Sequence, residues 1–243
     1  MNTDKFTLPS GIECEIKEFD GKTEKLLFDQ GMAKQGRTGD VILARSLISL
    51  DGKTFKDEAE AEAAVLDLYI GDRNYMTVKV RILNYGPEMY INHQCPNCKT
   101  WGGYQLNLED MLKGEGNEDF AIRSYGGDVS VTLSNGDKAV LTEMTGHTER
   151  RLALLKELTS LDIDTACVAS VNGERPKRSY FDNLPARDIK LIRDTYNEKL
   201  NGGMDGVVFL TCAGCNAEND VKISREPDFF LPGRMRSARR TRS

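Results

Sequence analysis

Residues 7–27 read TLPSGIECEIKEFDGKTEKLL, and residues 132–152 read TLSNGDKAVLTEMTGHTERRL. The two stretches align without a gap at an offset of 125 residues. The period is too long for a solenoid, so the repetition indicates two copies of one domain, each of roughly 110–120 residues. Identical pairs include Thr7 and Thr132, Leu8 and Leu133, Gly11 and Gly136, Glu18 and Glu143, Gly21 and Gly146, Thr23 and Thr148, and Glu24 and Glu149.

Each copy ends in a C-x-x-C motif, CPNC at residues 95–98 and CAGC at residues 212–215. Such a turn places two thiolates on one side of a tight loop and provides half of a tetrahedral zinc site. The 113 residues between the motifs exceed the spacing of an ordinary zinc ribbon, but a duplication accounts for them. We therefore predict one structural zinc, bound by Cys95, Cys98, Cys212 and Cys215.

Other interpretations of the two motifs remain open. Either motif could be a metal-free knuckle or a redox pair. A redox C-x-x-C normally opens a helix after a strand, whereas residues 217–224 alternate like a strand after the second motif, which favours a ribbon. The sequence allows the motifs to meet within one chain or across a dimer.

The predicted fold class is α+β, with two tandem similar modules joined by a shared four-cysteine zinc ribbon. Each module consists of a strand hairpin, helices and half of the ribbon. The predicted boundaries are residues 1–124 for the first module, 125–224 for the second and 225–243 for an arginine-rich tail. Periodicity and capping residues predict helices at 24–32, 41–49 (capped by Asp40), 57–68, 72–84, 108–112, 148–159, 164–171 and 185–200, and strands at 6–8, 12–19, 89–92, 104–106, 130–133, 139–142 and 206–211.

The composition is that of an ordinary globular protein, with 39% hydrophobic and 29% charged residues among 243. No apolar run reaches the ~18 residues that a membrane span requires, and residues 1–11 lack the features of a secretory signal. Six cysteines, four of them in the two motifs, suit a reducing compartment and a metal better than disulfides. Cys14 aligns with Ala139, which predicts a core position without chemistry.

The C-terminal tail differs in charge from the rest of the chain. The whole chain carries −5, but residues 225–243 hold six arginines against Glu226 and Asp228. An acidic body does not provide a broad phosphate-binding face, so we expect the tail to dock on a partner protein, with a solvated end or a nucleic-acid arm as alternatives. The predicted partner-binding residues are Phe229, Phe230, Arg234, Arg236, Arg239 and Arg240.

The sequence offers no catalytic constellation. The two histidines, His93 and His147, fall outside any H-E-x-x-H pattern, and neither a nucleophile elbow nor a P-loop occurs. A four-sulfur zinc site is closed to water and has a structural role. We therefore predict that the protein is not an enzyme. We also expect the acidic group Asp57, Glu58, Glu60 and Glu62 to be solvated, and Trp101 to pack over the first knuckle.

The first half contains TLPSG, the T-E-K-L-L helix, the D-R helix and CPNC, and the second contains TLSNG, FDNLPARDIKLIRD and CAGC. In these motifs and in the repeat, the chain resembles tail-baseplate proteins of contractile-tailed phages. The small baseplate hub family of T-even-type phages is the most similar, and tail-assembly chaperones share the L-P-S-G opening. CAGC departs from the family's CP-x-C by lacking the proline.

This resemblance implies a structural or assembly component of the baseplate hub, without catalysis. It implies that the partners are other baseplate, tail-tube or hub proteins and that no membrane is involved. It also implies that the protein is assembled in the host cytoplasm and becomes part of the virion, and it is compatible with several copies per particle. The alternative function is a zinc-ribbon adaptor that binds nucleic acid through the basic tail, although the acidic body makes nucleic acid the less favoured partner.

Overall fold

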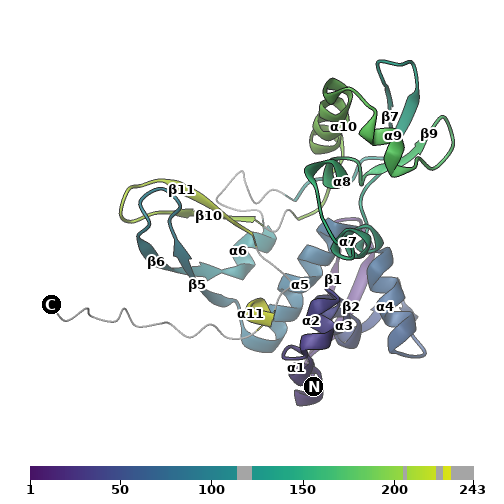
Figure 1. Ribbon diagram of the computed structural model, residues 1–243. Helices are drawn as coiled ribbons and strands as arrows, with labels where there is room; N and C mark the ends of the chain where they lie inside the picture. The colour runs from purple at the N-terminus through teal and green to yellow at the C-terminus, as the bar shows by residue number, and fades with distance from the viewer. Residues whose placement is uncertain (114–121, 205–206, 223–226, 231–243) are drawn as a thin grey trace.

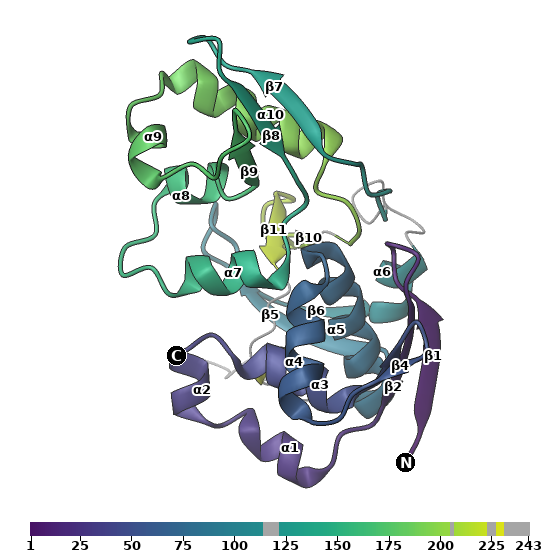
Figure 2. The same ribbon diagram turned by 90° about the vertical axis from the view of Figure 1, so that its right-hand side faces the viewer.

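The computed structural model describes residues 1–113, 122–204, 207–222 and 227–230. Its mixed helices and strands confirm the α+β class. The N-terminal part is an antiparallel sheet in the order β1-β2-β3-β4, and helices α3, α4 and α5 lie on one side of it (Figures 1 and 2). Its elements are β1 (Thr3–Thr7), β2 (Glu13–Lys17), α1 (Gly21–Leu26), α2 (Gln30–Lys34), α3 (Thr38–Ser46), β3 (Leu47–Leu50), β4 (Lys53–Thr54), α4 (Glu58–Asp67) and α5 (Ile70–Tyr85).

A second, smaller sheet in the order β7-β8-β9 packs against α10. Its elements are β7 (Val129–Thr132), β8 (Lys138–Leu141), α7 (Gly146–Ala153), α8 (Ser160–Asp164), β9 (Val168–Val171), α9 (Arg178–Asp182) and α10 (Ala186–Lys199). Two separate hairpins lie side by side beyond α5 (Figure 1). They are formed by β5 (Glu88–Gln94) with β6 (Trp101–Asn107) and by β10 (Val207–Thr211) with β11 (Glu218–Lys222), accompanied by α6 (Leu108–Lys113) and α11 (Pro227–Phe230).

The two sheets repeat each other's turn geometry. The Gly11 N–H donates to the Leu8 carbonyl at 2.8 Å, and the Gly136 N–H donates to the Leu133 carbonyl at 2.9 Å. Both glycines have positive φ, +91° and +88°. A residue with a Cβ is strained in this region of backbone space, which explains why glycine stands at both positions.

The third strand of each sheet is attached in the same way. Asp51 Oδ1 accepts from the backbone N–H of Glu13 at 2.8 Å, and Asn172 Oδ1 accepts from that of Lys138 at 2.9 Å. The pairing shifts register between Glu15 and Ile16 in one sheet and between Val140 and Leu141 in the other. These positions are 125 residues apart, as the sequence alignment requires, so the repeat extends to hydrogen bonds and irregularities.

Two clusters of buried apolar residues form separate cores. The first joins the β1–β4 sheet to α3, α4 and α5, and it also takes in Val208 and Leu210 of β10. The second joins the β7–β9 sheet to α10 through Ile192 and Tyr196. The chain therefore leaves the first core, builds the second, and returns to the first through β10 and β11.

Two segments that the sequence predicted to be helical contain strands instead. Residues 41–49 were expected to be helical, but α3 stops at Ser46 and Leu47–Leu50 forms β3. Residues 164–171 were expected to be helical, but α8 stops at Asp164 and Val168–Val171 forms β9. Leu47–Leu50 pairs with β2, and Val168–Val171 pairs with β8. That pairing satisfies their backbone groups and buries their alternate side chains, which overrides local helical preference.

A buried network of charges joins the two cores. Arg73 of α5 donates to Asp40 of α3 and to Glu149 of α7, and the Arg73 side chain is only 2% exposed. Arg150 of α7 also donates to Asp40, at 2.9 Å, and to Glu62 of α4. Helix α7 follows the second sheet's hairpin yet is held by carboxylates of the first half, so this network fixes how the two halves meet.

This network corrects two expectations. Asp40 was expected to cap a helix, but the helix begins at Thr38, and the Asp40 carboxylate pairs with arginines instead. Glu62 was expected to be solvated, but it is 8% exposed and binds Arg37 at 2.8 and 3.2 Å. Burial opposes its ionisation, yet hydrogen bonds from Arg37 and Arg150 outweigh burial and lower the pKa of Glu62.

A second buried acid lies at the start of α5. Asp72 Oδ1 accepts from the Ser10 N–H at 3.0 Å and from the Tyr125 hydroxyl at 3.1 Å. Asp72 Oδ2 has no hydrogen-bond partner among the described residues. The corresponding Asp188 of α10 accepts from the Ser134 N–H and hydroxyl, one on each oxygen, at 3.1 and 2.6 Å. Burial raises the pKa of Asp72.

Close backbone packing surrounds Asp72. A Cβ on Gly71 would lie 2.2 Å from the carbonyl oxygen of Gly202, so the two backbones can approach only because glycine stands there. Glu143 accepts from the N–H groups of Asn201 and Gly202, both at 3.1 Å. Burial raises its pKa, and the charge of Asp72 adds to this effect.

Along the ranges that the structure covers, no helix combines the length and apolar character needed to cross a bilayer.

Asp40→Ala should lower the free energy of unfolding by about 3–5 kcal/mol, because it removes the buried carboxylate that binds both Arg73 and Arg150 and leaves their positive charges only partly offset by Glu149 and Glu62. Lys5→Ala is the matched control, since Lys5 and Glu13 form an exposed pair at 3.9 Å and such pairs contribute about 1 kcal/mol or less. Urea denaturation measures both. Equal losses in the two variants would show that the network is not what joins the halves.

Asp72→Asn should change how stability depends on pH. Because the folded-state pKa of Asp72 is raised, its contribution is complete below the ordinary carboxyl pKa of about 4 and is lost as pH rises through the folded value. The asparagine variant does not titrate, so its unfolding free energy should improve relative to wild type as pH increases. A flat difference between Asp72→Asn and wild type would contradict the assignment.

Candidate metal centre

The four cysteines lie at the tips of the two hairpins. Strand β5 leads into Cys95 and β6 leaves the turn, while β10 and β11 do the same around Cys212. The Cys95 N–H donates to the Thr100 carbonyl at 3.0 Å, and the Cys212 N–H donates to the Ala217 carbonyl at 2.9 Å. The two turns are therefore closed by equivalent hydrogen bonds.

Each turn also contains one residue in the left-handed region. Lys99 has φ +62° and Asn216 has φ +56°. Each lies four residues after the first cysteine of its motif, and its N–H donates to that cysteine's carbonyl, at 2.9 and 2.8 Å. This shared backbone path presents both thiols of each motif toward the opposite hairpin.

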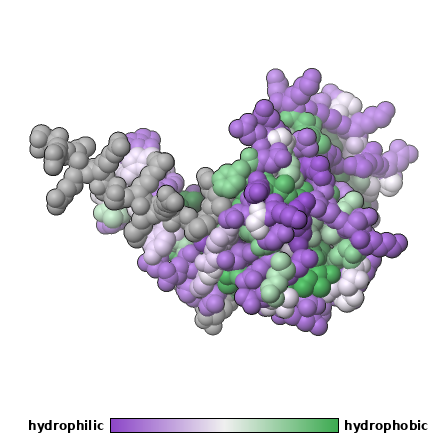
Figure 3. Space-filling model, turned by 90° about the horizontal axis from the view of Figure 1, so that it is seen from below, coloured by the Kyte–Doolittle hydropathy of each residue, from purple (hydrophilic) through white to green (hydrophobic). Residues whose placement is uncertain are grey.

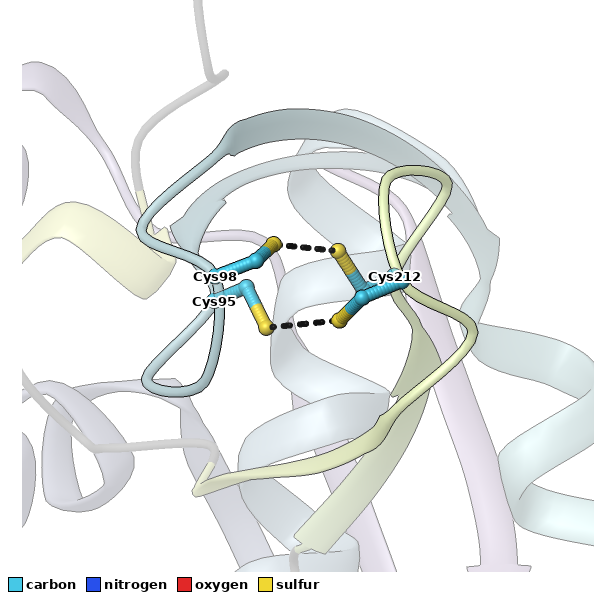
Figure 4. Close-up of side chains that lie close together, drawn as sticks. Cys95, Cys98 and Cys212 are labelled. Atoms are coloured by element: carbon cyan, nitrogen blue, oxygen red, sulfur yellow. Dashed lines mark hydrogen bonds between the residues drawn. The ribbon is translucent and has the colours of Figure 1, made fainter.

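The sulfur atoms meet in one cluster (Figure 4). The Sγ atoms of Cys95 and Cys215 are 3.7 Å apart, and those of Cys98 and Cys212 are 3.6 Å apart. All four Sγ atoms lie within 4.8 Å of one another. A tetrahedron with Zn–S bonds of 2.3 Å has S···S edges of about 3.8 Å. The donor set and its spacing therefore fit a divalent ion such as zinc.

N–H groups from both turns are directed at the sulfur atoms. The Gly214 N–H lies 3.4 Å from Cys212 Sγ, and the Asn97 side-chain amide lies 3.5 Å from Cys215 Sγ. Such contacts favour thiolate over thiol, which is the form that binds metal. A Cβ on Gly214 would lie 3.1 Å from Thr100 Oγ1 and 3.5 Å from Cys98 Sγ, so the small residue lets the two turns approach.

The thiols influence one another's ionisation. Hydrogen bonds from the side chain and backbone of Thr100 lower the pKa of Cys98 to about 6. The backbone N–H of Cys98 is the main reason that the pKa of Cys95 is lowered. At Cys212 the Gly214 N–H acts in the same direction, but burial and the neighbouring sulfurs of Cys98 and Cys95 prevail and raise the pKa to about 11. Four thiolates this close need a cation to offset their repulsion.

The structure brings together all four cysteines that the sequence singled out, and it does so within one chain. The dimer alternative is therefore not needed. Sequence reasoning missed Thr100, whose hydrogen bonds lower the pKa of Cys98, although it lies only two residues after the first motif. Gly214 inside the second motif favoured a ribbon from the sequence, but its close approach to Thr100 and Cys98 is visible only in the structure. His93 is not part of the sulfur cluster. Trp101 was expected to cover the first knuckle, but it is 67% exposed.

The predicted partner-binding residues have a different outcome. Phe229 and Phe230 were assigned to a partner, but both rings are buried in the first core of this chain, 3% and 0% exposed. Arg81 of α5 holds their backbone by donating to the Phe229 carbonyl at 3.2 Å. Burial of two large aromatic rings in the chain's own core is the physical reason for this correction. Arg234, Arg236, Arg239 and Arg240 lie outside the described residues.

Cys98→Ser should reduce the zinc bound per chain and lower the melting temperature together, because metal-binding energy adds to the folding energy of such sites. Cys14→Ala is the control, since Cys14 is buried outside the cluster. It should keep its metal and cost only about 1–2 kcal/mol of packing. Elemental analysis and thermal denaturation provide the two measurements. Wild-type zinc content in Cys98→Ser, or metal loss in Cys14→Ala, would show that other residues are the ligands.

Comparison with known proteins gives one match. The model of the family described as T4 bacteriophage base plate protein matches residues 1–231 of this chain. Comparison with curated proteins and comparison with solved structures gave no match. The family match spans the described part of both sheets, both hairpins and all four clustered cysteines. The chain therefore belongs to the T4 bacteriophage base plate protein family.

Proposed function

We propose that this protein is a structural or assembly component of the hub region of a phage tail baseplate, where it binds other tail and baseplate proteins and catalyses no reaction. The observation that supports this most is the family match over residues 1–231. In this proposal the partners are baseplate, tail-tube or hub proteins. The protein is assembled in the host cytoplasm and remains in the tail of the virion, and one particle can contain several copies of it.

The proposal includes a structural zinc held by Cys95, Cys98, Cys212 and Cys215. Its support is the donor set and the S···S distances of 3.6 and 3.7 Å. When bound, the ion would supply charge neutralisation and a cross-link rather than reactivity, because four sulfur ligands leave no open position for water. The cross-link would tie the β10–β11 hairpin to the β5–β6 hairpin.

We also propose a two-module organisation, with residues 1–124 and 125–224 as the modules and 225–243 as a docking segment whose arginines face a partner while Phe229 and Phe230 pack in the first core. The equivalent turns, registers and third-strand attachments of the two sheets support it. The hairpin that carries the second cysteine motif packs on the first core. In this arrangement the chain leaves the first core after one hairpin and returns to it with the other, and the metal would link these two hairpins with the second module between them.

A nucleic-acid adaptor is the second candidate, and the arginines at residues 234–242 are the observation that favours it. Its binding should weaken steeply with salt and disappear when residues 234–243 are deleted. The exposed acidic residues Glu218 and Asp220 on the second hairpin argue against a phosphate-binding ribbon. The baseplate proposal is therefore the better supported.

Mass spectrometry of purified phage particles should detect this protein at a fixed ratio to other tail proteins. A structural component remains in the finished particle, whereas an assembly chaperone leaves it. Lysate from cells arrested before tail completion serves as the control for expression. Detection in that lysate but not in particles would limit the function to assembly, and normal baseplates in its absence would contradict both roles.

A further inference from the structure

A group of apolar side chains is exposed where α7 ends. The sequence predicts a helix through Thr159, but α7 stops at Ala153. The segment that follows turns toward α8 and leaves Leu154 65% exposed and Leu158 52% exposed. Ile163 of α8 is 49% exposed. Three large aliphatic side chains thus face solvent within residues 154–163, and we call this surface the α7–α8 face.

Helix α2 adjoins this face. A Cβ placed on Gly36, just after α2, would lie 3.5 Å from the Cβ of Ala153, the last residue of α7. Figure 2 shows α2 below the outer end of α7, with α8 above it. The α7–α8 face is therefore bordered by helices and is not an isolated loop.

The other large apolar residues that are exposed in the described ranges lie more than 20 residues apart in the sequence: Met1, Phe28, Trp101, Ile122 and Leu191. Leu191 of α10 is 39% exposed and Trp101 is 67% exposed on the β5–β6 hairpin. On the side of the molecule seen in Figure 3, hydrophobic residues are set among hydrophilic ones. Scattered apolar residues are ordinary on a protein surface, but neighbouring ones mark sites of interaction.

Positive charges border the α7–α8 face although the chain as a whole carries −5. Arg151 and Lys156 are exposed beside the leucines, and Lys34 is exposed at the end of α2. Glu157 is the exposed acidic residue in the same stretch. An apolar surface with a predominantly basic border complements an apolar surface bordered by carboxylates, because opposite charges guide association and reject like-charged surfaces.

We propose that the α7–α8 face binds an acidic amphipathic segment of a neighbouring baseplate protein, with its apolar side chains against Leu154, Leu158 and Ile163. A helix with aliphatic residues at three- and four-residue spacing and acidic residues beside them has this chemistry. The inference rests on the proposed function, because it assigns a surface to the binding of other tail proteins. It gives α7 two roles, one toward the first core through Glu149 and Arg150 and one toward a partner.

The test uses a phage whose copy of this gene is inactivated and which is complemented by the full-length chain. The double variant Leu154→Ser/Leu158→Ser should fail to restore complete baseplates in electron micrographs. Leu191→Ser removes an exposed leucine of α10 and is the matched control, expected to restore them. Purified variants must keep wild-type zinc content and melting temperature, which separates loss of binding from loss of folding.

Direct binding uses the other baseplate proteins of the same phage, each purified and titrated singly against the wild-type chain. For the protein that binds, the double variant should bind roughly thirtyfold more weakly, as expected for loss of a contact worth about 2 kcal/mol. Lys156→Glu should weaken the same complex, and added salt should reduce the difference between Lys156→Glu and wild type.

The outcomes separate the inference from the proposed function. Normal baseplates with the double variant overturn the inference and leave the function intact. Normal baseplates without any copy of the protein overturn the function itself. Self-association of the wild-type chain that the double variant abolishes would assign the face to a second copy, and stronger binding by Lys156→Glu would assign it to a basic partner; either result overturns the acidic partner.

Discussion

The return of the chain to its first core is the constraint on which the rest of the structure depends. Strand β10 buries Val208 and Leu210 against the core that β2 and α5 began, more than 100 residues earlier in the chain. Loop closure of this length costs entropy, and burial of apolar side chains in the first core compensates for it; a metal bound by the four sulfurs at the hairpin tips would add to this compensation. Everything between β6 and β10 is consequently held at both ends.

The junction between the halves uses chemistry of a different kind. Apolar contact alone is non-directional, whereas the Arg73 guanidinium and the Asp40 carboxylate have fixed geometry and a high desolvation cost if separated. The glycine contact beside Asp72 adds a steric requirement, because no side chain fits between Gly71 and Gly202. Together these groups allow one relative placement of the sheets, which suits a protein that is built into a larger assembly.

The duplicated sheets show how similar sequences acquire different surroundings. Asp72 and Asp188 occupy corresponding positions at the starts of α5 and α10, and each accepts from a backbone N–H in the hairpin turn of its own sheet. Asp188 also takes a serine hydroxyl, while Asp72 lies at the junction and takes the hydroxyl of Tyr125. The copy at the junction has therefore become part of the contact between halves.

Residue identity and spacing alone predicted the repeat, the α+β class, the family and the four cysteines that meet in one cluster. The tertiary structure was needed to show that Leu47–Leu50 and Val168–Val171 are strands, since pairing with β2 and β8 outweighs local preference. It also decided that Phe229 and Phe230 are core residues and that Asp40 and Glu62 are buried. The sequence does not distinguish an aromatic or acidic residue that faces a partner or the solvent from one that is buried in the chain's own interior, because burial is set by contacts between distant segments.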